Sequence, residues 1–253
     1  MNDFRRSMMP ASEDRDPEPA EQAGRFLKQD MPKHKQESRF TDIHNDSWRF
    51  MKLLEKIDLK EDDHLYLLGD LFDRCMDHPD PAGVYFQVLK LGKKCTVIRG
   101  NHDHWLANYI FRYYGIDERD RALLQPYPYN SFHLLQERLT EVDLKELAEY
   151  ILSWPVQVEI EVDGQPYLLA HACTAEPGKW KLDNYYLMGD LWYKVFLHEG
   201  VHGYISVCGH QNMGNGSIWK NKKGNVYLCD CGCGFENGRL GCLCLETKET
   251  FYV

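Results

Sequence analysis

The stretch HLYLLGDLFDR, residues 64–74, begins as a short apolar run and ends in three charged side chains, the first of which is Asp70. Such a run is typical of a buried strand. Three further apolar runs along the chain end in polar side chains in the same way, and they lead to Asn101, His171 and His210. Because ligand residues in α/β folds gather at the carboxyl ends of strands, we expect these four side chains to lie close together.

Helices and strands alternate in the first part of the folded chain, and strands dominate the second part. The spacing of apolar residues predicts helices over 46–57, 81–92 and most of 108–153. Alternation around Asp163-Gly164 predicts a β-hairpin within 156–172. Residues 225–253 are expected to form a β-meander with a turn at Asn237-Gly238. The pattern alone indicates a mixed α/β fold.

Composition places the chain among ordinary globular proteins. It has 253 residues, of which 43% are hydrophobic and 27% charged. No apolar run approaches the roughly 18 residues that a membrane helix needs, and the N-terminus lacks an apolar signal core, so we expect a cytoplasmic protein without membrane contact. The formal net charge of −9 argues against broad nucleic-acid binding. Bound metal ions could still attract an anionic substrate locally.

The N-terminal segment differs from the rest of the chain. Residues 1–39 contain 4 of the 11 prolines, many charges and few large apolar side chains. Such a segment cannot bury enough surface to offset its loss of conformational entropy. We therefore predict a mostly disordered extension over 1–39, with a short helix near 21–27, and one folded domain over 40–253.

The nine cysteines are an odd number, which together with the expected location predicts reduced thiols rather than a disulfide framework. Five of them stand in C-x-C patterns at Cys229, Cys231, Cys233, Cys242 and Cys244. Zinc sites favour two or more intervening residues. We favour apolar packing on one strand face over zinc binding or redox chemistry.

Asp42 and His44 add a carboxylate and an imidazole ahead of the first apolar run. Side chains two apart in an extended segment point the same way, so this pair could bind one metal ion. Carboxylate, amide and imidazole donors suit Mn, Fe or Zn. A carboxylate able to bridge, flanked by histidines, suggests two ions. The full candidate set is Asp42, His44, Asp70, Asn101, His171 and His210.

Five motifs in this order resemble the metallophosphoesterase (calcineurin-like) superfamily. They are DIH at 42–44, GDLFDR at 69–74, GNHD at 100–103, the histidine at 171 and GH at 209–210. Arg99 before the Gly-Asn-His sequence and Asn212 in place of a second histidine are more similar to the serine/threonine protein phosphatase branch. The resemblance covers the chain from about residue 40 to its end. It implies two packed mixed β-sheets flanked by helices, an αββα sandwich.

The resemblance also implies a role for each matching metal ligand. One ion would be bound by Asp42, His44 and Asp70. Asp70 would bridge to a second ion, which Asn101, His171 and His210 would complete. A hydroxide between the two ions would attack phosphorus in line, since bound metal lowers the pKa of water to about 7. Mn is the metal we expect, with Fe or Zn as alternatives.

Four further residues would serve the reaction directly. Arg74 and Arg99 would bind the non-bridging phosphate oxygens, a task that suits a planar guanidinium. His102 would protonate the leaving oxygen, oriented by Asp73. The implied activity is phosphomonoester hydrolysis on phosphoproteins or small phosphoesters and nucleotides. One alternative is hydrolysis of dinucleoside polyphosphates, as in symmetrical diadenosine tetraphosphatases.

The chain departs from the family pattern at several positions. Asn45 and Cys75 stand where glycines are common, and Asp103 stands in place of a glutamate. The residues before Asp42 lack the apolar strand that usually supports this half of the site. A further phosphate-binding arginine has no clear match, and Lys194 is the nearest cation. These departures keep open the alternative of a catalytically impaired scaffold.

Overall fold

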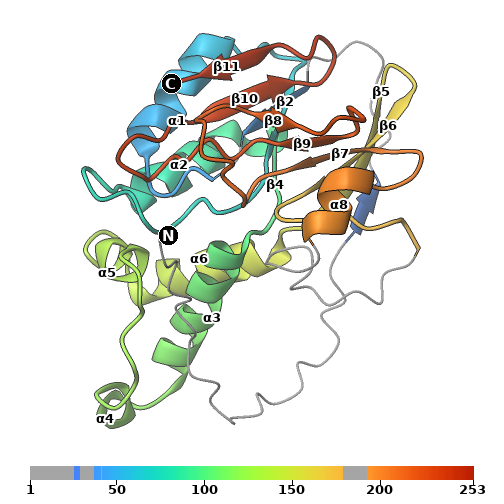
Figure 1. Cartoon of the computed structure of the whole chain (residues 1–253). Coiled ribbons are helices and arrows are strands. Elements are labelled where there is room, and N and C mark those ends of the chain that lie inside the picture. The colour runs from blue at the N-terminus through green and yellow to red at the C-terminus, as the bar shows by residue number, and fades with distance from the viewer. Residues whose placement is uncertain (1–25, 29–36, 41, 179–192) are drawn as a thin grey trace, which may run out of the picture.

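Two mixed β-sheets pack against each other in the computed structural model, which describes residues 26–28, 37–40, 42–178 and 193–253 (Figure 1). The five-stranded sheet has the order β11-β10-β2-β3-β4. Its strands are β2 (Glu37–Phe40), β3 (His64–Leu67), β4 (Cys95–Val97), β10 (Gly241–Cys244) and β11 (Thr250–Tyr252). β2, β3 and β4 run parallel, and β10 pairs antiparallel with both β2 and β11.

The six-stranded sheet has the order β1-β5-β6-β7-β9-β8. Its strands are β1 (Phe26–Lys28), β5 (Gln157–Val162), β6 (Gln165–Ala170), β7 (Ile205–Cys208), β8 (Trp219–Lys220) and β9 (Val226–Leu228). β5 and β6 form the predicted antiparallel hairpin around Asp163-Gly164. β6, β7 and β9 are parallel.

Successive side chains of β3 and of β9 alternate between two apolar layers, as the period of two requires. In β3, Leu65 and Leu67 pack toward the helices, whereas Tyr66 packs against the other sheet. In β9, Tyr227 lies between the sheets, and its neighbours Val226 and Leu228 pack on the outer face with Phe196 of α8. The molecule therefore has four layers, and the predicted αββα sandwich is confirmed.

The helices cover the outer faces of this sandwich (Figure 1). They are α1 (Ser47–Ile57), α2 (Pro81–Leu91), α3 (Asn101–Gly115), α4 (Glu118–Arg121), α5 (Ser131–Gln136), α6 (Glu141–Ser153) and α8 (Tyr193–Glu199), and a 3₁₀ turn, η1 (Gly92–Lys94), precedes β4. Asp46 caps the start of α1, where its carboxylate accepts from Arg49 N at 2.9 Å. None of the helices in the described ranges is long and apolar enough to cross a bilayer.

Two strands lie within the segment that we predicted to be a mostly disordered extension. β2 ends directly before residue 41 and pairs in parallel with β3, so a strand does precede Asp42 although its sequence, ESRF, is polar. β1 occupies part of the predicted short helix. Backbone pairing on both sides of β2 explains how a polar sequence is held as a strand. Residues 1–25 and 29–36 lie outside the described residues.

Two further expectations need correction. The predicted β-meander is divided, because β9 belongs to the six-stranded sheet while β10 and β11 belong to the other sheet. Asn237-Gly238 lies in the segment that crosses between them. The helix expected from about 108 begins at Asn101 instead, so the polar GNHD motif forms the first turn of α3.

The packing of the segment between β9 and β10 predicts that the stability of the fold depends strongly on Gly238. A Cβ at this position would collide with the backbone carbonyl of Gly232. We expect Gly238→Ala to lower the free energy of unfolding by about 1–3 kcal/mol, the usual range for overpacking. Gly115→Ala is the matched control, since a Cβ there has open space and favours the helix. Urea unfolding of both variants measures this, and equal stability would contradict the prediction.

Candidate metal centre

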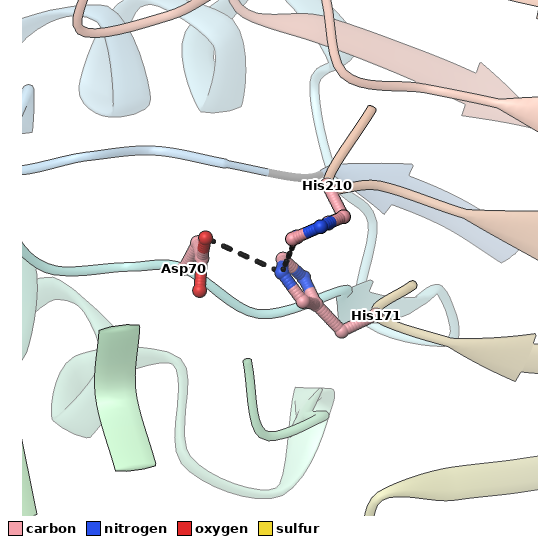
Figure 2. A group of neighbouring side chains, drawn as sticks. All are labelled: Asp70, His171 and His210. Carbon is pink, nitrogen blue, oxygen red and sulfur yellow. Dashed lines mark hydrogen bonds and ion pairs between the residues drawn. The ribbon is translucent and has the colours of Figure 1, made fainter. Parts of the chain in front are cut away.

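The carboxyl ends of four strands, two from each sheet, meet at one edge of the sandwich. β3 and β4 lead to Asp70 and Asn101, and β6 and β7 lead to His171 and His210. Figure 2 shows Asp70, His171 and His210 directed toward one another from these different segments. The expected convergence of the four strand ends is present in the structure.

Two groups of potential metal-binding side chains share one carboxylate. Asp42, His44 and Asp70 form the first group, and Asp70, His171 and His210 form the second; within each, the ligand atoms lie within 4.8 Å of one another. All except His210 are buried, and His210 is partly buried. The shared residue is Asp70, the one for which the family resemblance implies a bridging role.

His171 is oriented so that one ring nitrogen faces the donor group. Its Nδ1 lies 2.7 Å from the carbonyl oxygen of Leu68, which fixes Nδ1 as the protonated nitrogen. Its Nε2 lies 3.0 Å from Asn101 Oδ1 and 3.1 Å from His210 Nδ1. It is also 3.3 Å from Asp70 Oδ2. The amide oxygen of Asn101 thus belongs to the same cluster as the second group.

Asp42 and His44 reach the site from a loop rather than an extended segment. Both residues have positive φ values, 48° and 49°. Their backbone N–H groups donate to the carbonyls of Gly69 and Asp70, each at 3.1 Å, which lays this loop alongside the loop after β3. The expectation that an extended backbone aligns the pair is therefore wrong, and hydrogen bonding to the neighbouring loop brings the two side chains together instead.

Left-handed backbone conformations recur in the site. Asp70, Asp73, Arg74 and His210 have φ values of 51°, 70°, 65° and 63°. Asp, Asn and His adopt this region more readily than most residues, but it is still costly. Such conformations persist where the surroundings over-determine them, and they cluster at functional sites.

Asp103 ties the two inner strand ends together. Its carboxylate accepts from Gly100 N at 2.9 Å, from Asp70 N at 2.9 Å and from Leu71 N at 2.8 Å. Burial, together with the nearby charge of Asp70, raises the pKa of Asp103 to about 6. The shorter acid at this position, noted as a departure from the family pattern, therefore fixes the loop that carries Asp70.

His102 and Asp73 form the predicted hydrogen-bonded pair. His102 Nδ1 lies 2.9 Å from Asp73 Oδ2, and both side chains are fully buried. Arg74 Nη2 donates to His102 Nε2 at 3.1 Å, so Nδ1 carries the proton that is donated to Asp73. Tyr127, which the sequence did not single out, donates from its hydroxyl to the same Asp73 oxygen at 2.7 Å.

A polar network supports the loop of Asp73 from behind. Asp73 N donates to Ser131 Oγ at 2.6 Å, and Ser131 Oγ donates to Asn45 Oδ1 at 3.0 Å. Asn45 Nδ2 in turn donates to Asn130 Oδ1 at 3.0 Å. Asn45, which replaces a glycine of the family pattern, has thus become a structural partner of α5 and of the Asp73 loop.

The two arginines have different surroundings. The Arg74 guanidinium lies beside His102 and over the ring of Phe235, with 5.0 Å between its Cζ and the ring centroid. Arg99 is buried, and its Nη1 donates to the carbonyl oxygen of Leu152 at 3.1 Å, which joins the end of β4 to α6. The phosphate-binding role of Arg99 stays a prediction. The side chain of Lys194 lies outside the described residues.

The charges within the site shift its pKa values in opposite directions. Burial alone would lower the pKa of His171, but the carboxylates of Asp70 and Asp42 raise it to about 10. Burial lowers the pKa of His44 to about 3 and that of His210 to about 4. Burial would raise the pKa of Asp70, yet the surrounding histidines hold it well below its usual range. The carboxylate of Asp70 and the three imidazoles therefore change one another's pKa values at close range.

Asp230 is a further acid near the site that sequence reasoning missed. It is 6% exposed, and burial, with a smaller contribution from Asp70, raises its pKa to about 6. Its side chain accepts from Gly232 N at 2.8 Å. It lies between Cys229 and Cys231 of the C-x-C pattern, where the sequence suggested only the cysteines as candidate ligands.

The cysteines of the C-x-C patterns pack as apolar side chains, though not on one strand face. Cys229 lies between the sheets, whereas Cys233 and Cys242 lie in the core beneath the helices. All nine cysteines are in the described part of the chain, and none forms a disulfide. The candidate metal-binding groups found among the described residues consist of aspartate and histidine alone.

The donor set fits divalent metal ions. Buried carboxylates and imidazoles at this spacing would repel or compete for protons without a cation, and buried charges in proteins are paired or coordinate metals. Oxygen and imidazole ligands without thiolates suit Mn, Fe or Zn. Each of the two groups that share Asp70 could hold a metal ion.

Comparisons with known proteins agree with this geometry. Residues 40–232 match the family described as calcineurin-like phosphoesterase, a span that contains every predicted ligand. No curated protein sequence matches the chain.

Among solved structures, a candidate diadenosine tetraphosphatase has a TM-score of 0.65 at 16% identity, over 91% of this chain and 97% of that chain. A serine/threonine phosphatase from Saccharomyces cerevisiae has a TM-score of 0.57 at 12% identity, over 91% and 82%. A cold-active protein-tyrosine phosphatase of a psychrophilic Shewanella species has a TM-score of 0.56 at 15% identity, over 90% and 78%. At these identities the likeness concerns the fold.

The shared carboxylate predicts an unequal effect of ligand substitutions on metal content. After loading with Mn²⁺ and dialysis, we expect about two ions per chain in the unaltered protein, about one in His210→Ala and less than one in Asp70→Ala, because Asp70 belongs to both groups. Elemental analysis measures this. His202→Ala, an exposed histidine outside both groups, is the control. Equal losses in the two ligand variants would contradict the shared role.

The three backbone donors on Asp103 predict a stability loss in Asp103→Asn. An amide offers one acceptor oxygen and would direct its NH₂ group at backbone N–H groups. We expect a loss of about 1–3 kcal/mol in the free energy of unfolding, the cost of leaving buried donors unsatisfied. Asp143→Asn, at the exposed cap of α6, should lower the free energy of unfolding much less, because water can satisfy the backbone donor there. Thermal and urea unfolding measure the difference, and the prediction fails if Asp143→Asn costs as much.

Proposed function

The chain belongs to the calcineurin-like phosphoesterase family and is a metal-dependent phosphoester hydrolase, and we propose that it is a two-metal phosphomonoesterase of the serine/threonine protein phosphatase type. The substrate would be a phosphoprotein or a small phosphoester. Manganese is the proposed metal, with iron and zinc as alternatives, because oxygen and imidazole donors without thiolate suit all three. A cytoplasmic location remains a prediction from the sequence.

One observation carries the proposal: the buried His102–Asp73 pair and the Arg74 guanidinium lie next to Asp70, the residue that both candidate metal-binding groups share. His102 contacts Asp73 at 2.9 Å and Arg74 at 3.1 Å, and its backbone N–H donates to Asp70 Oδ1 at 3.0 Å. A protein that only displayed the fold to a partner would need neither the pair nor the arginine. Their arrangement favours a catalyst over an impaired scaffold.

The metal ions would be bound by the aspartate, asparagine and histidine cluster, and would supply an activated water and neutralise charge on the phosphoryl group. Arg74 would bind non-bridging phosphate oxygens, where a guanidinium makes strong paired hydrogen bonds. His102 would give a proton from Nε2 to the leaving oxygen. Asp73, which accepts from Nδ1, would hold the imidazole in position throughout.

The contact between Arg74 and His102 links binding to acid catalysis. In the structure Arg74 donates to His102 Nε2, the nitrogen that must carry the transferred proton. Acid catalysis therefore requires Arg74 to leave this nitrogen and the nitrogen to take up a proton from water before it gives one to the leaving oxygen. A phosphate oxygen is a stronger acceptor for the guanidinium than a neutral imidazole, so the substrate itself would draw Arg74 away.

Hydrolysis of dinucleoside polyphosphates is the second candidate. The chain aligns with 97% of the candidate diadenosine tetraphosphatase, so the two proteins have similar extents as well as folds. Both reactions would use the same cluster, and they differ in what surrounds the phosphate.

The decisive test is phosphate release from p-nitrophenyl phosphate with and without added Mn²⁺, for the unaltered protein and for His102→Asn. We expect turnover that depends on Mn²⁺ and a kcat lower by a factor of about 10²–10⁴ in the variant, the usual contribution of a positioned acid. His202→Ala should retain full activity, because His202 is exposed and outside the site.

Two other results would redirect the assignment. Release of nucleotides from diadenosine tetraphosphate, with no turnover of p-nitrophenyl phosphate, would favour the second candidate. Absence of turnover on both substrates, with fewer than two ions bound per chain, would favour the scaffold.

A further inference from the structure

The phenol of Tyr127 and the imidazole of His102 donate to the same carboxylate oxygen. Tyr127 Oη lies 2.7 Å from Asp73 Oδ2, and His102 Nδ1 lies 2.9 Å from that oxygen. The other oxygen of Asp73, Oδ1, is buried and has no hydrogen-bond partner among the described residues. Among described side chains, Tyr127 is therefore the one donor besides His102 that compensates the buried carboxylate.

Tyr127 is held firmly in this position. It is 5% exposed and lies between α3 and α5. Its ring contacts Tyr109, Tyr129 and Phe132, with centroid distances of 5.0, 5.7 and 6.5 Å. Burial and the adjacent Asp73 charge raise the pKa of Tyr127 far above its ordinary value, so the hydroxyl keeps the proton that it donates. The phenol is a fixed donor rather than a mobile side chain.

The second donor fixes the direction in which the Asp73 carboxylate faces His102. The Tyr127 hydroxyl and His102 Nδ1 are both bonded to Oδ2, while Oδ1 has no hydrogen-bond partner among the described residues. Without the hydroxyl, the carboxylate would be free to rotate, and the imidazole would lose part of the contact that orients its ring.

We propose that Tyr127 is a positioning residue for the reaction, which holds the Asp73 carboxylate aligned with His102 Nδ1 and thereby keeps the imidazole in place. The inference rests on the proposed function for its kinetic consequence. It adds a third member, supplied by the segment before α5, to the His102–Asp73 pair. A purely structural role would need only the aromatic ring of Tyr127, since the ring makes the packing contacts.

The conservative variant Tyr127→Phe separates these two roles, because it removes the hydroxyl and keeps the ring. Leaving groups differ in how much they need an acid: p-nitrophenolate departs readily, whereas phenolate departs poorly. With added Mn²⁺ we expect Tyr127→Phe to lower kcat on phenyl phosphate by about 10-fold, part of the 10²–10⁴ available to acid catalysis, and to change kcat on p-nitrophenyl phosphate much less. In the His102→Asn background, the same substitution should lower kcat on phenyl phosphate no more than it lowers kcat on p-nitrophenyl phosphate.

Tyr113→Phe is the matched control, since Tyr113 belongs to the same aromatic cluster and contacts Phe132 at 4.9 Å. It should retain both activities. Equal losses on the two substrates in Tyr127→Phe would show a structural role and overturn the proposal, as would unchanged activity on both.

A second readout does not depend on turnover or on added metal. The proton on His102 Nδ1 is buried and bonded to a carboxylate, so it should give a proton NMR signal far downfield, which disappears in His102→Asn. We expect this signal to change position in Tyr127→Phe, because its acceptor, Asp73 Oδ2, loses the second donor that fixes the carboxylate. An unchanged signal would overturn the proposal. If the unaltered protein hydrolyses neither substrate, the proposed function fails, and the NMR comparison alone decides whether Tyr127 acts on Asp73.

Discussion

A single buried carboxylate, that of Asp70, constrains the rest of the site. It belongs to both candidate metal-binding groups, and its side chain is also reached by the backbone N–H of His102. Its own backbone N–H is fixed by Asp103, and its carbonyl accepts from His44. A shift of Asp70 would alter both groups and the position of His102, so the loops from the two sheets must place their side chains around the same point. The packed sheets hold these loops in fixed relative positions.

The sheets consist of strands with ordinary backbone conformations and apolar packing, whereas the unfavourable conformations and buried charges are concentrated in the site. The strands alternate apolar side chains between two layers, and the core between the sheets contains large residues such as Tyr66 and Tyr167. At the strand ends the chain adopts left-handed conformations, buries several charges and places carboxylates close together. Natural proteins tolerate such local conflicts where function requires them and compensate elsewhere. Asp103 and the Asn45–Ser131 network are compensations of this kind, since they satisfy backbone donors that the unusual loop geometry would otherwise leave buried.

Much of the fold could be predicted from the sequence, because apolar runs, caps and turn residues act locally. The helix after Asp46, the helix after Asp80 and the hairpin at Asp163-Gly164 follow such signals. β2 could not be recognised, since three of its four residues are polar and the strand is held by pairing with β3 and β10, which lie later in the sequence. The division of β9 from β10 and β11 likewise depends on which sheet each strand joins. Within the site, the ligand positions followed strand ends, but Tyr127 and Asp230 carry no local motif and become visible only when the chain is folded.

The order of the site residues along the chain has a consequence for how the protein is made. Asp42, His44 and Asp70 lie within a short stretch, whereas the second group also needs His171 and His210, and the contact between His210 N and the Asp42 carboxylate spans 168 positions. During translation the first group emerges from the ribosome well before the second can exist. The second group can form only after β7, the strand that leads to His210, has joined the six-stranded sheet. A nascent chain that ends before His210 could therefore occupy only the first of the two groups.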